Sequence, residues 1–183
     1  MLLVPAEAPC QSIDSTALQW SDSPHRLGFP ATSTFRFLSR GDDQVYDLNY
    51  RYRQQQGRHL RASLSLRYNS SDSDQFILNT RVGLDRVFKQ SANHKWQFYT
   101  GADLALGIEK RSTGGRWYYA GGIVPFIGAQ YRITEHFSLS TEPGFLLQVR
   151  HLNETDSFNT PEDETWFEAE FMNIGQILIS FHF

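Results

Sequence analysis

The sequence contains little cysteine, little lysine and no long apolar run. Cys10 is the single cysteine among 183 residues, so no disulfide can form within the chain. No apolar stretch approaches the roughly 20 residues that a membrane-spanning helix requires. The net charge is −3, which provides no basic field for nucleic acid. A disulfide scaffold, a helical membrane protein and a nucleic-acid-binding protein are therefore all disfavoured.

Regular alternation of apolar and polar residues is the main feature that the chain does have. In residues 60–68, for example, Leu60, Ala62 and Leu64 are separated by Arg61 and Ser63. A period of two is typical of a β-strand whose two faces meet different surroundings. Eight such segments are separated by turn-forming residues, and they span 33–39, 45–53, 60–68, 76–88, 96–109, 117–133, 137–149 and 171–183. The sequence therefore predicts an all-β fold of eight antiparallel strands in up-and-down order.

The polar faces of these strands carry charged residues of both signs beside small residues such as Gly101 and Gly128. Arginine outnumbers lysine by 14 to 3, and arginine suits paired, poorly hydrated sites better than lysine does. We therefore expect the polar faces to point into a narrow barrel and the apolar faces to point outward into lipid. The expected interior charge network consists of Arg51, Arg61, Arg67, Arg81, Asp85, Asp103, Glu109, Glu142, Arg150 and Glu170.

The last predicted strand, residues 171–183, has the most specific pattern. Ile177, Ile179, Phe181 and Phe183 lie on one face, and the sequence stops on the aromatic Phe183. This strand resembles the C-terminal strand of Gram-negative outer-membrane β-barrels, where it closes the barrel and serves as the assembly signal. Over residues 32–183 the chain is similar in architecture to small barrels of the OmpA transmembrane domain and OmpX type. The resemblance implies an eight-stranded transmembrane β-barrel, the smallest size of that class.

The resemblance also implies a location in the cell outer membrane with both termini in the periplasm. Residues 1–31 would be a signal-peptide remnant and an N-terminal periplasmic arm. Residues 54–58, 90–94 and 134–136 would form short periplasmic turns, and residues 151–164 a long outer loop. The implied partners are outer-membrane lipid and lipopolysaccharide, the barrel-assembly machinery, and a protein partner within an outer-membrane complex.

Aromatic residues make up 14% of the chain, and transmembrane barrels use aromatics in a girdle at each membrane interface. One expected girdle, near the short turns, comprises Trp96, Phe98, Tyr131, Phe137, Phe181 and Phe183. The other, near the opposite rim, comprises Tyr68, Phe76, Trp117, Tyr119, Trp166 and Phe167. This placement favours a barrel that crosses a bilayer.

A non-enzymatic barrel with a structural or protein-interaction role is the leading interpretation. No open pore is expected, because an eight-stranded barrel is just wide enough inside for its own side chains. No catalytic residue, cofactor or metal site is predicted, since the histidines lack the spacing of metal ligands.

Two alternative functions remain open at this stage. One is an outer-membrane lipid A-modifying enzyme, a deacylase or acyltransferase, because a nucleophilic serine needs a nearby base and an orienting carboxylate. The set His136, Ser138 and Glu142 resembles the His-Ser-Glu constellation of outer-membrane lipid A deacylases. The candidates for an acyl-transfer or metal site are His151, Glu154, Asp156 and Ser157. The other alternative is a soluble, lipocalin-like ligand-binding barrel, in which the apolar faces would point inward.

Overall fold

The protein is all-β in the computed structural model, which describes residues 24–31, 43–55, 57–69, 75–111, 116–155, 161–172 and 176–183. The strands are β1 (His25–Pro30), β2 (Asp43–Gln55), β3 (Arg58–Asn69), β4 (Gln75–Gln90), β5 (Trp96–Arg111), β6 (Arg116–Arg132), β7 (Phe137–Thr141), β8 (Gly144–Thr155), β9 (Pro161–Met172) and β10 (Leu178–His182). All neighbouring strands are antiparallel. No helix in the described ranges is long and apolar enough to cross a membrane.

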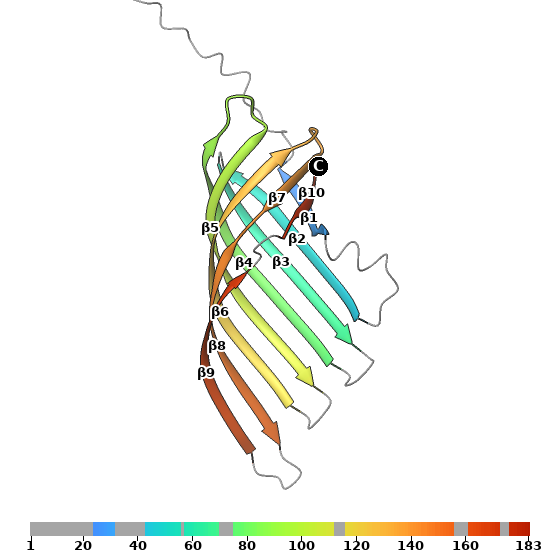
Figure 1. Ribbon diagram of the computed structural model, residues 1–183, viewed down its shortest axis with the longest axis vertical. Coiled ribbons are helices and arrows are strands. Elements are labelled where there is room, and N and C mark those ends of the chain that lie inside the picture. The colour runs from blue at the N-terminus through green and yellow to red at the C-terminus, as the bar shows by residue number, and fades with distance from the viewer. Residues whose placement is uncertain are drawn as a thin grey trace, which may run out of the picture.

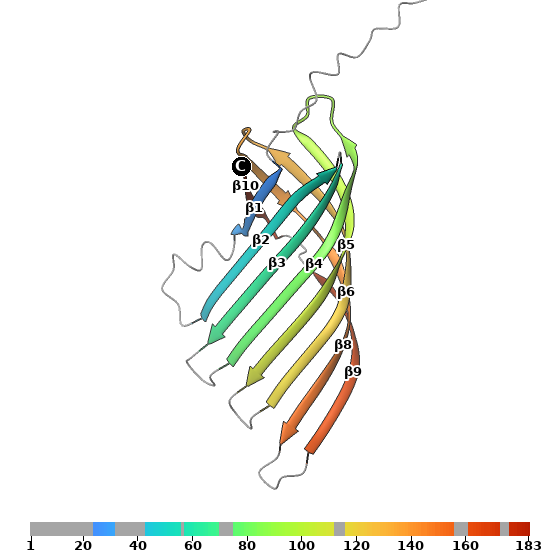
Figure 2. The same ribbon diagram turned by 180° about the vertical axis from the view of Figure 1, so that it is seen from behind.

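These strands close into an eight-stranded antiparallel barrel (Figures 1 and 2). β1 to β6 follow one another around the wall, β6 pairs with β7, β7 with β10, and β10 with β1. β7 and β8 form one wall strand in two parts, and so do β9 and β10. The predicted fold class, an all-β barrel of eight antiparallel strands, is confirmed.

The interruption between β7 and β8 has a clear chemical cause at Glu142 and Pro143. Proline has no N–H group and cannot donate a hydrogen bond to the neighbouring strand. The Pro143 carbonyl still accepts a hydrogen bond from the Ile127 N–H at 3.1 Å, so β6 continues past the break. The break lies where the Glu142 side chain enters the barrel interior.

Strands of unequal length make the two ends of the barrel different. At the end that we call the turn end, tight turns join β2 to β3, β4 to β5 and β6 to β7, and Gly57 (φ 77°) and His94 (φ 54°) adopt left-handed conformations in two of them. β2 to β6, β8 and β9 continue well beyond β1 and β10 toward the opposite end, the far end (Figure 1). Within the described residues, β9 pairs with β8 alone.

The burial pattern is inverted relative to a water-soluble protein. On β5, Leu104 is 67% exposed on the outer face, whereas its neighbour Asp103 is 4% exposed on the inner face. Among the described residues, twelve buried side chains are polar or charged and six are apolar, while the outer wall is covered by exposed leucine, isoleucine, valine and aromatic side chains. The prediction that the polar faces point inward is therefore correct.

Aromatic rings gather on the outer wall near the turn end. Trp96 lies 4.9 Å from Tyr131 and 6.3 Å from Phe98, and Phe137 lies 4.4 Å from Phe181, measured between ring centroids. Near the far end, Trp117 stacks with Tyr119 at 6.4 Å. Trp166 is an exception to the predicted girdle, because its register partner is the inward-facing Arg150 and its ring packs edge-on against Tyr118.

Several predicted segment boundaries differ from the structure, and the last strand, predicted at 171–183, is divided between the end of β9 at Met172 and β10 at Leu178–His182. β1 occupies His25–Pro30 and pairs with β2 and β10, so barrel structure begins within the range that the sequence assigns to the N-terminal arm, residues 1–31. The strand predicted at 33–39 and the signal-peptide remnant at residues 1–10 lie outside the described residues. The long loop predicted at 151–164 is wrong over most of its length, because β8 extends to Thr155 and β9 begins at Pro161 in one continuous ladder.

Candidate functional site

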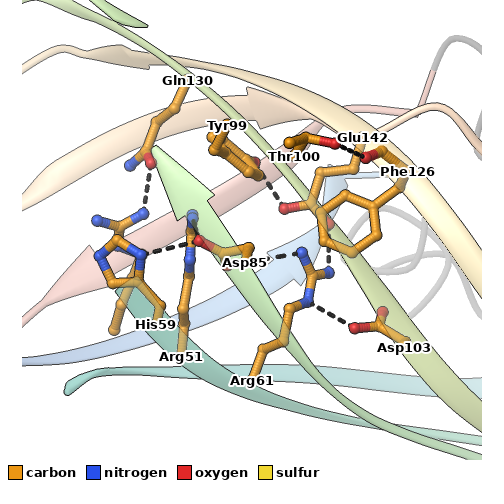
Figure 3. Close-up of polar contacts among 11 residues, drawn as sticks. Arg51, His59, Arg61, Asp85, Tyr99, Thr100, Asp103, Phe126, Gln130 and Glu142 are labelled. Atoms are coloured by element: carbon orange, nitrogen blue, oxygen red, sulfur yellow. Dashed lines mark hydrogen bonds and ion pairs between the residues drawn. The ribbon is translucent and has the colours of Figure 1, made fainter. Parts of the chain in front are cut away.

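Arg61 is the centre of a charge cluster that fills the barrel near the turn end (Figure 3). Its guanidinium lies 2.5 Å from a Glu142 oxygen, 3.2 Å from Asp103 Oδ1 and 3.9 Å from Asp85 Oδ2. The three carboxylates come from β4, β5 and the β7–β8 break, so one side chain on β3 connects opposite walls. All four side chains are nearly inaccessible to water, and such pairs are strong only when each charge is compensated.

Asp85 also binds two further side chains, Arg51 and His59. Arg51 from β2 donates to Asp85 Oδ1, and His59 Nδ1 lies 2.8 Å from the same oxygen. Arg26 from β1 donates to the side-chain Oε1 of Gln130 across the barrel. These contacts tie β1, β2, β3, β4 and β6 together and leave little free space at this level.

Two aromatic rings complete this part of the interior because glycines lie opposite them. Tyr99 pairs with Gly128 and Phe126 pairs with Gly101 across the β5–β6 ladder, and a Cβ atom on either glycine would overlap the facing ring. The guanidinium of Arg51 lies 4.1 Å from the centroid of the Tyr99 ring, within the range of a cation–π contact.

Arg61 makes a cation–π contact with Phe126, as Arg51 does with Tyr99. The Arg61 guanidinium lies 4.0 Å from the centroid of Phe126. The Tyr99 hydroxyl, for its part, donates a 2.6 Å hydrogen bond to Glu142. Rings and ion pairs therefore form one packed unit, which we call the plug: Arg51, His59, Arg61, Asp85, Tyr99, Asp103, Phe126 and Glu142.

A second charge cluster lies nearer the far end. Arg150 on β8 binds Glu109 at 3.0 Å and Glu168 at 3.4 Å. Glu109 also accepts hydrogen bonds from Gln75 at 2.8 Å and Arg111 at 2.5 Å. This cluster is separate from the plug, so the predicted single network is in fact two.

A cavity of about 540 Å³ lies between the two clusters. It exists because the inward positions of β5 and β6 at this level are small, namely Ala105, Gly107 and Ala120. The predicted network residues Arg67, Arg81 and Glu170 line this cavity. The structure gives none of these three a hydrogen bond or ion pair to another described residue, which sets them apart from the rest of the predicted network.

The residues considered for catalysis are not brought together. His136 is exposed in the β6–β7 turn, where it lies 3.7 Å from Glu135, and Ser138 is fully buried and lies 2.8 Å from His182 Nε2. Glu142 belongs to the plug. His151 contacts Thr165 at 2.9 Å on the outer face, while Asp156 and Ser157 lie outside the described residues. Within the described ranges, no group of three or more His, Cys, Asp or Glu side chains could hold a metal ion.

The proposed assembly residues lie on the outer wall at the closure point. Ile177, Phe181 and Phe183 are 48%, 41% and 60% exposed, and Ile179 is half-buried on the same face. β10 pairs with both β1 and β7 there, and the Phe183 N–H donates to the His25 carbonyl at 3.1 Å.

Several interior residues were not predicted from the sequence. Tyr99, Gln130 and His182 fall on the predicted polar faces, and His59 directly precedes the strand predicted at 60–68. None of these side chains carries a charge pattern that marks it as part of a network. Glu168 lies in the strand that the sequence assigns partly to a loop. The available signal was the alternation itself, which places each of these side chains on the inner face.

Comparison with known proteins finds no matching family model, no similar curated protein and no similar solved structure. The fold and its interior therefore define the class by themselves: a small, closed, antiparallel β-barrel with a charged interior and an apolar outer wall. The resemblance to small outer-membrane barrels rests on this architecture and on the pattern of the last strand.

Proposed function

We propose that this protein is an outer-membrane β-barrel of a Gram-negative cell with a structural or protein-interaction role, as a subunit of a larger outer-membrane assembly. The observation that carries the proposal is the inverted burial of β4 and β5. Leu84, Leu104 and Leu106 are 58%, 67% and 64% exposed. Asp85 and Asp103, the sequence neighbours of Leu84 and Leu104, are each 4% exposed.

The exposure of apolar side chains on the outer wall favours lipid rather than water as the surroundings of the barrel. Exposed apolar surface in water costs roughly 25 cal/mol per Å², and a wall of such side chains in water would aggregate. In a bilayer the same wall is solvated by lipid tails, and the pairing of β10 with both β1 and β7 satisfies backbone groups between strands, as a bilayer requires. Aromatic rings near the turn end fit the interfacial level of a membrane.

The interior supports a structural rather than a transporting role. The plug connects β2 to β6 and the β7–β8 break through ion pairs and cation–π contacts, so solute passage through the closed end would require several buried ion pairs to break. A lipocalin-like function is disfavoured, because a ligand cavity of that kind needs an apolar inner face. The set His136, Ser138 and Glu142 does not support a lipid A-modifying enzyme, since each of the three has a different partner.

Cell fractionation combined with gel mobility tests the proposal. The chain, preceded by an export signal, is produced in a Gram-negative host, and its membrane fractions are run in detergent with and without boiling. We expect the protein in the outer-membrane fraction, with a mobility that changes on heating because the barrel resists detergent until it is boiled. Recovery in the soluble fraction without a mobility change would overturn the membrane assignment.

A further inference from the structure

We infer that the cavity between the two charge clusters is a binding site for a small organic anion, whose phosphoryl or carboxylate group is held by Arg81 and Arg67. The cavity volume of about 540 Å³ falls in the usual range for ligand sites. Because the site lies inside the barrel, its binding is measured separately from membrane insertion.

The two arginines differ from the other interior arginines in forming no hydrogen bond or ion pair with a described residue, although the carboxylate of Asp103 attracts Arg81 electrostatically. Arg51 binds Asp85, Arg61 binds three carboxylates, and Arg150 binds Glu109 and Glu168. Arg67 and Arg81 line the cavity, and neither forms a hydrogen bond or an ion pair with a described residue. Arg81 is half-buried and Arg67 is exposed, so the hydrogen-bond donors of both guanidiniums are available to a ligand in the cavity.

The charge balance of the cavity favours an anion. Glu109 lines it but is already bound by Arg150 and Arg111, which leaves Glu170 as the one lining acid, against Arg67 and Arg81, that has no ion pair with a described residue. Arg150 Nε is also buried there without a partner. Arginine binds phosphoryl and carboxylate groups through two parallel hydrogen bonds, which suits this set of donors.

The remaining lining indicates an organic molecule rather than a bare ion. Ile77, Leu146 and Met172 contribute apolar surface, and Asn79 and Gln148 contribute amide groups that can orient a ligand. A bare phosphate would leave most of this volume unfilled. An anionic group attached to an apolar body of a few carbon atoms uses both kinds of lining, and such a group can belong to a free solute or to a lipid head group.

The test uses the full chain in phosphatidylcholine nanodiscs, with the arginine Nε–Hε resonances followed by NMR. Three probes are added separately: inorganic phosphate, n-hexyl phosphate, and phosphatidylglycerol incorporated into the disc. We expect hexyl phosphate to shift the Arg81 and Arg67 resonances and to bind at least about tenfold more tightly than phosphate, because its chain adds apolar contact. A shift with phosphatidylglycerol as well would identify a lipid head group as the source, and its absence a free solute.

Substitutions show whether the binding belongs to this cavity. Arg81→Gln and Arg67→Gln should each weaken hexyl phosphate binding by about tenfold, since each removes a charge-assisted contact. Arg86→Gln is the matched control, because Arg86 lies on the same strand as Arg81 but faces outward, and it should bind as the parent does. Should Arg81→Gln fail to fold, the exposed Arg67 provides the independent variant. Absence of any probe-induced shift at both arginines, or equal weakening by all three substitutions, would overturn the site.

Discussion

Arg61 illustrates, at the scale of single residues, how this barrel keeps charges in a narrow interior. Its side chain is 12% exposed, and three carboxylates from three parts of the wall converge on it. Removing the guanidinium would leave Asp85 with Arg51 and His59, but Asp103 and Glu142 would keep no ion-pair partner in the described part of the chain. Breaking one side of a buried ion pair is costly because the uncompensated charge remains in a poorly hydrated site.

The substitution Arg61→Ala should therefore lower the free energy of unfolding by about 3–5 kcal/mol, measured by denaturant titration of the folded barrel in detergent. Arg111→Ala is the control: Arg111 is 48% exposed and its partner Glu109 keeps Arg150, so we expect a loss below about 1 kcal/mol. Equal losses for the two variants would mean that the plug is hydrated rather than buried.

Gly128 gives a second residue-scale prediction through the ring of Tyr99. A Cβ atom at Gly128 would overlap that ring, whereas one at Gly121, on the outer face of the same strand, would have Leu106 Cδ2 at 3.9 Å as its nearest neighbour. Gly128→Ala should destabilise the barrel by about 1–3 kcal/mol through overpacking. Gly121→Ala should be neutral or slightly stabilising. Thermal midpoints of the gel-mobility change measure both, and a neutral Gly128→Ala would argue against the packed ring.

Alternation predicted which face each residue occupies but not which residues meet. Asp85 and Asp103 were correctly placed inside, because period two alone determines the face. Contacts depend on the register and tilt of strands across the barrel, which no local pattern encodes. Arg81, which was expected in the charge network, is attracted by Asp103 but forms no ion pair with a described residue and lines a cavity. Trp166 was expected in a girdle and instead faces inward.

At the scale of elements, β10 closes the barrel although it is only five residues long. It pairs with β1 on one side and β7 on the other, and β1 is itself short. The outward-facing row of Ile177, Ile179, Phe181 and Phe183 contributes ring contacts at this closure. The centroid of the Phe183 ring lies 5.8 Å from that of the His25 ring. This position allows the row to act both in packing and as the proposed assembly signal.

Comparison of Phe183→Ser with Phe171→Ser separates the packing role of Phe183 from its role as an assembly signal. Phe171 is the control, because it is an outward-facing aromatic on β9 that is 69% exposed. If the terminal residue is an assembly signal, Phe183→Ser should reduce the amount of folded protein in the outer membrane several-fold relative to Phe171→Ser. The refolding yield of the two purified variants in detergent should be similar. Equal amounts of the two variants in cells would contradict an assembly role.

Element boundaries were harder to predict than element types. β1 contains Gly28 and ends at Pro30, and such residues locally suggest a turn, so only pairing with β2 and β10 makes this segment a strand. The β8–β9 hairpin runs through a polar, acidic stretch that resembles a loop in composition. There the continuous ladder to Thr155 and Pro161 overrides the weak strand propensity of the residues.

At the scale of the whole molecule, the account depends on which side of the wall faces lipid. The interior has charge pairs at two levels and a cavity of mixed lining between them, and the outer wall carries many exposed apolar side chains. A membrane barrel requires this arrangement, whereas a soluble barrel requires the reverse.

The most direct measurement uses nitroxide labels on single cysteines in a Cys10→Ser background, with the protein in lipid bilayers. Leu104→Cys places a label on the outer wall and Asn79→Cys places one in the cavity. We predict that oxygen, which concentrates in hydrocarbon, relaxes the label at position 104 most strongly, and that a water-soluble nickel chelate relaxes the label at position 79. Preferential access of the nickel chelate to position 104 would contradict the membrane account.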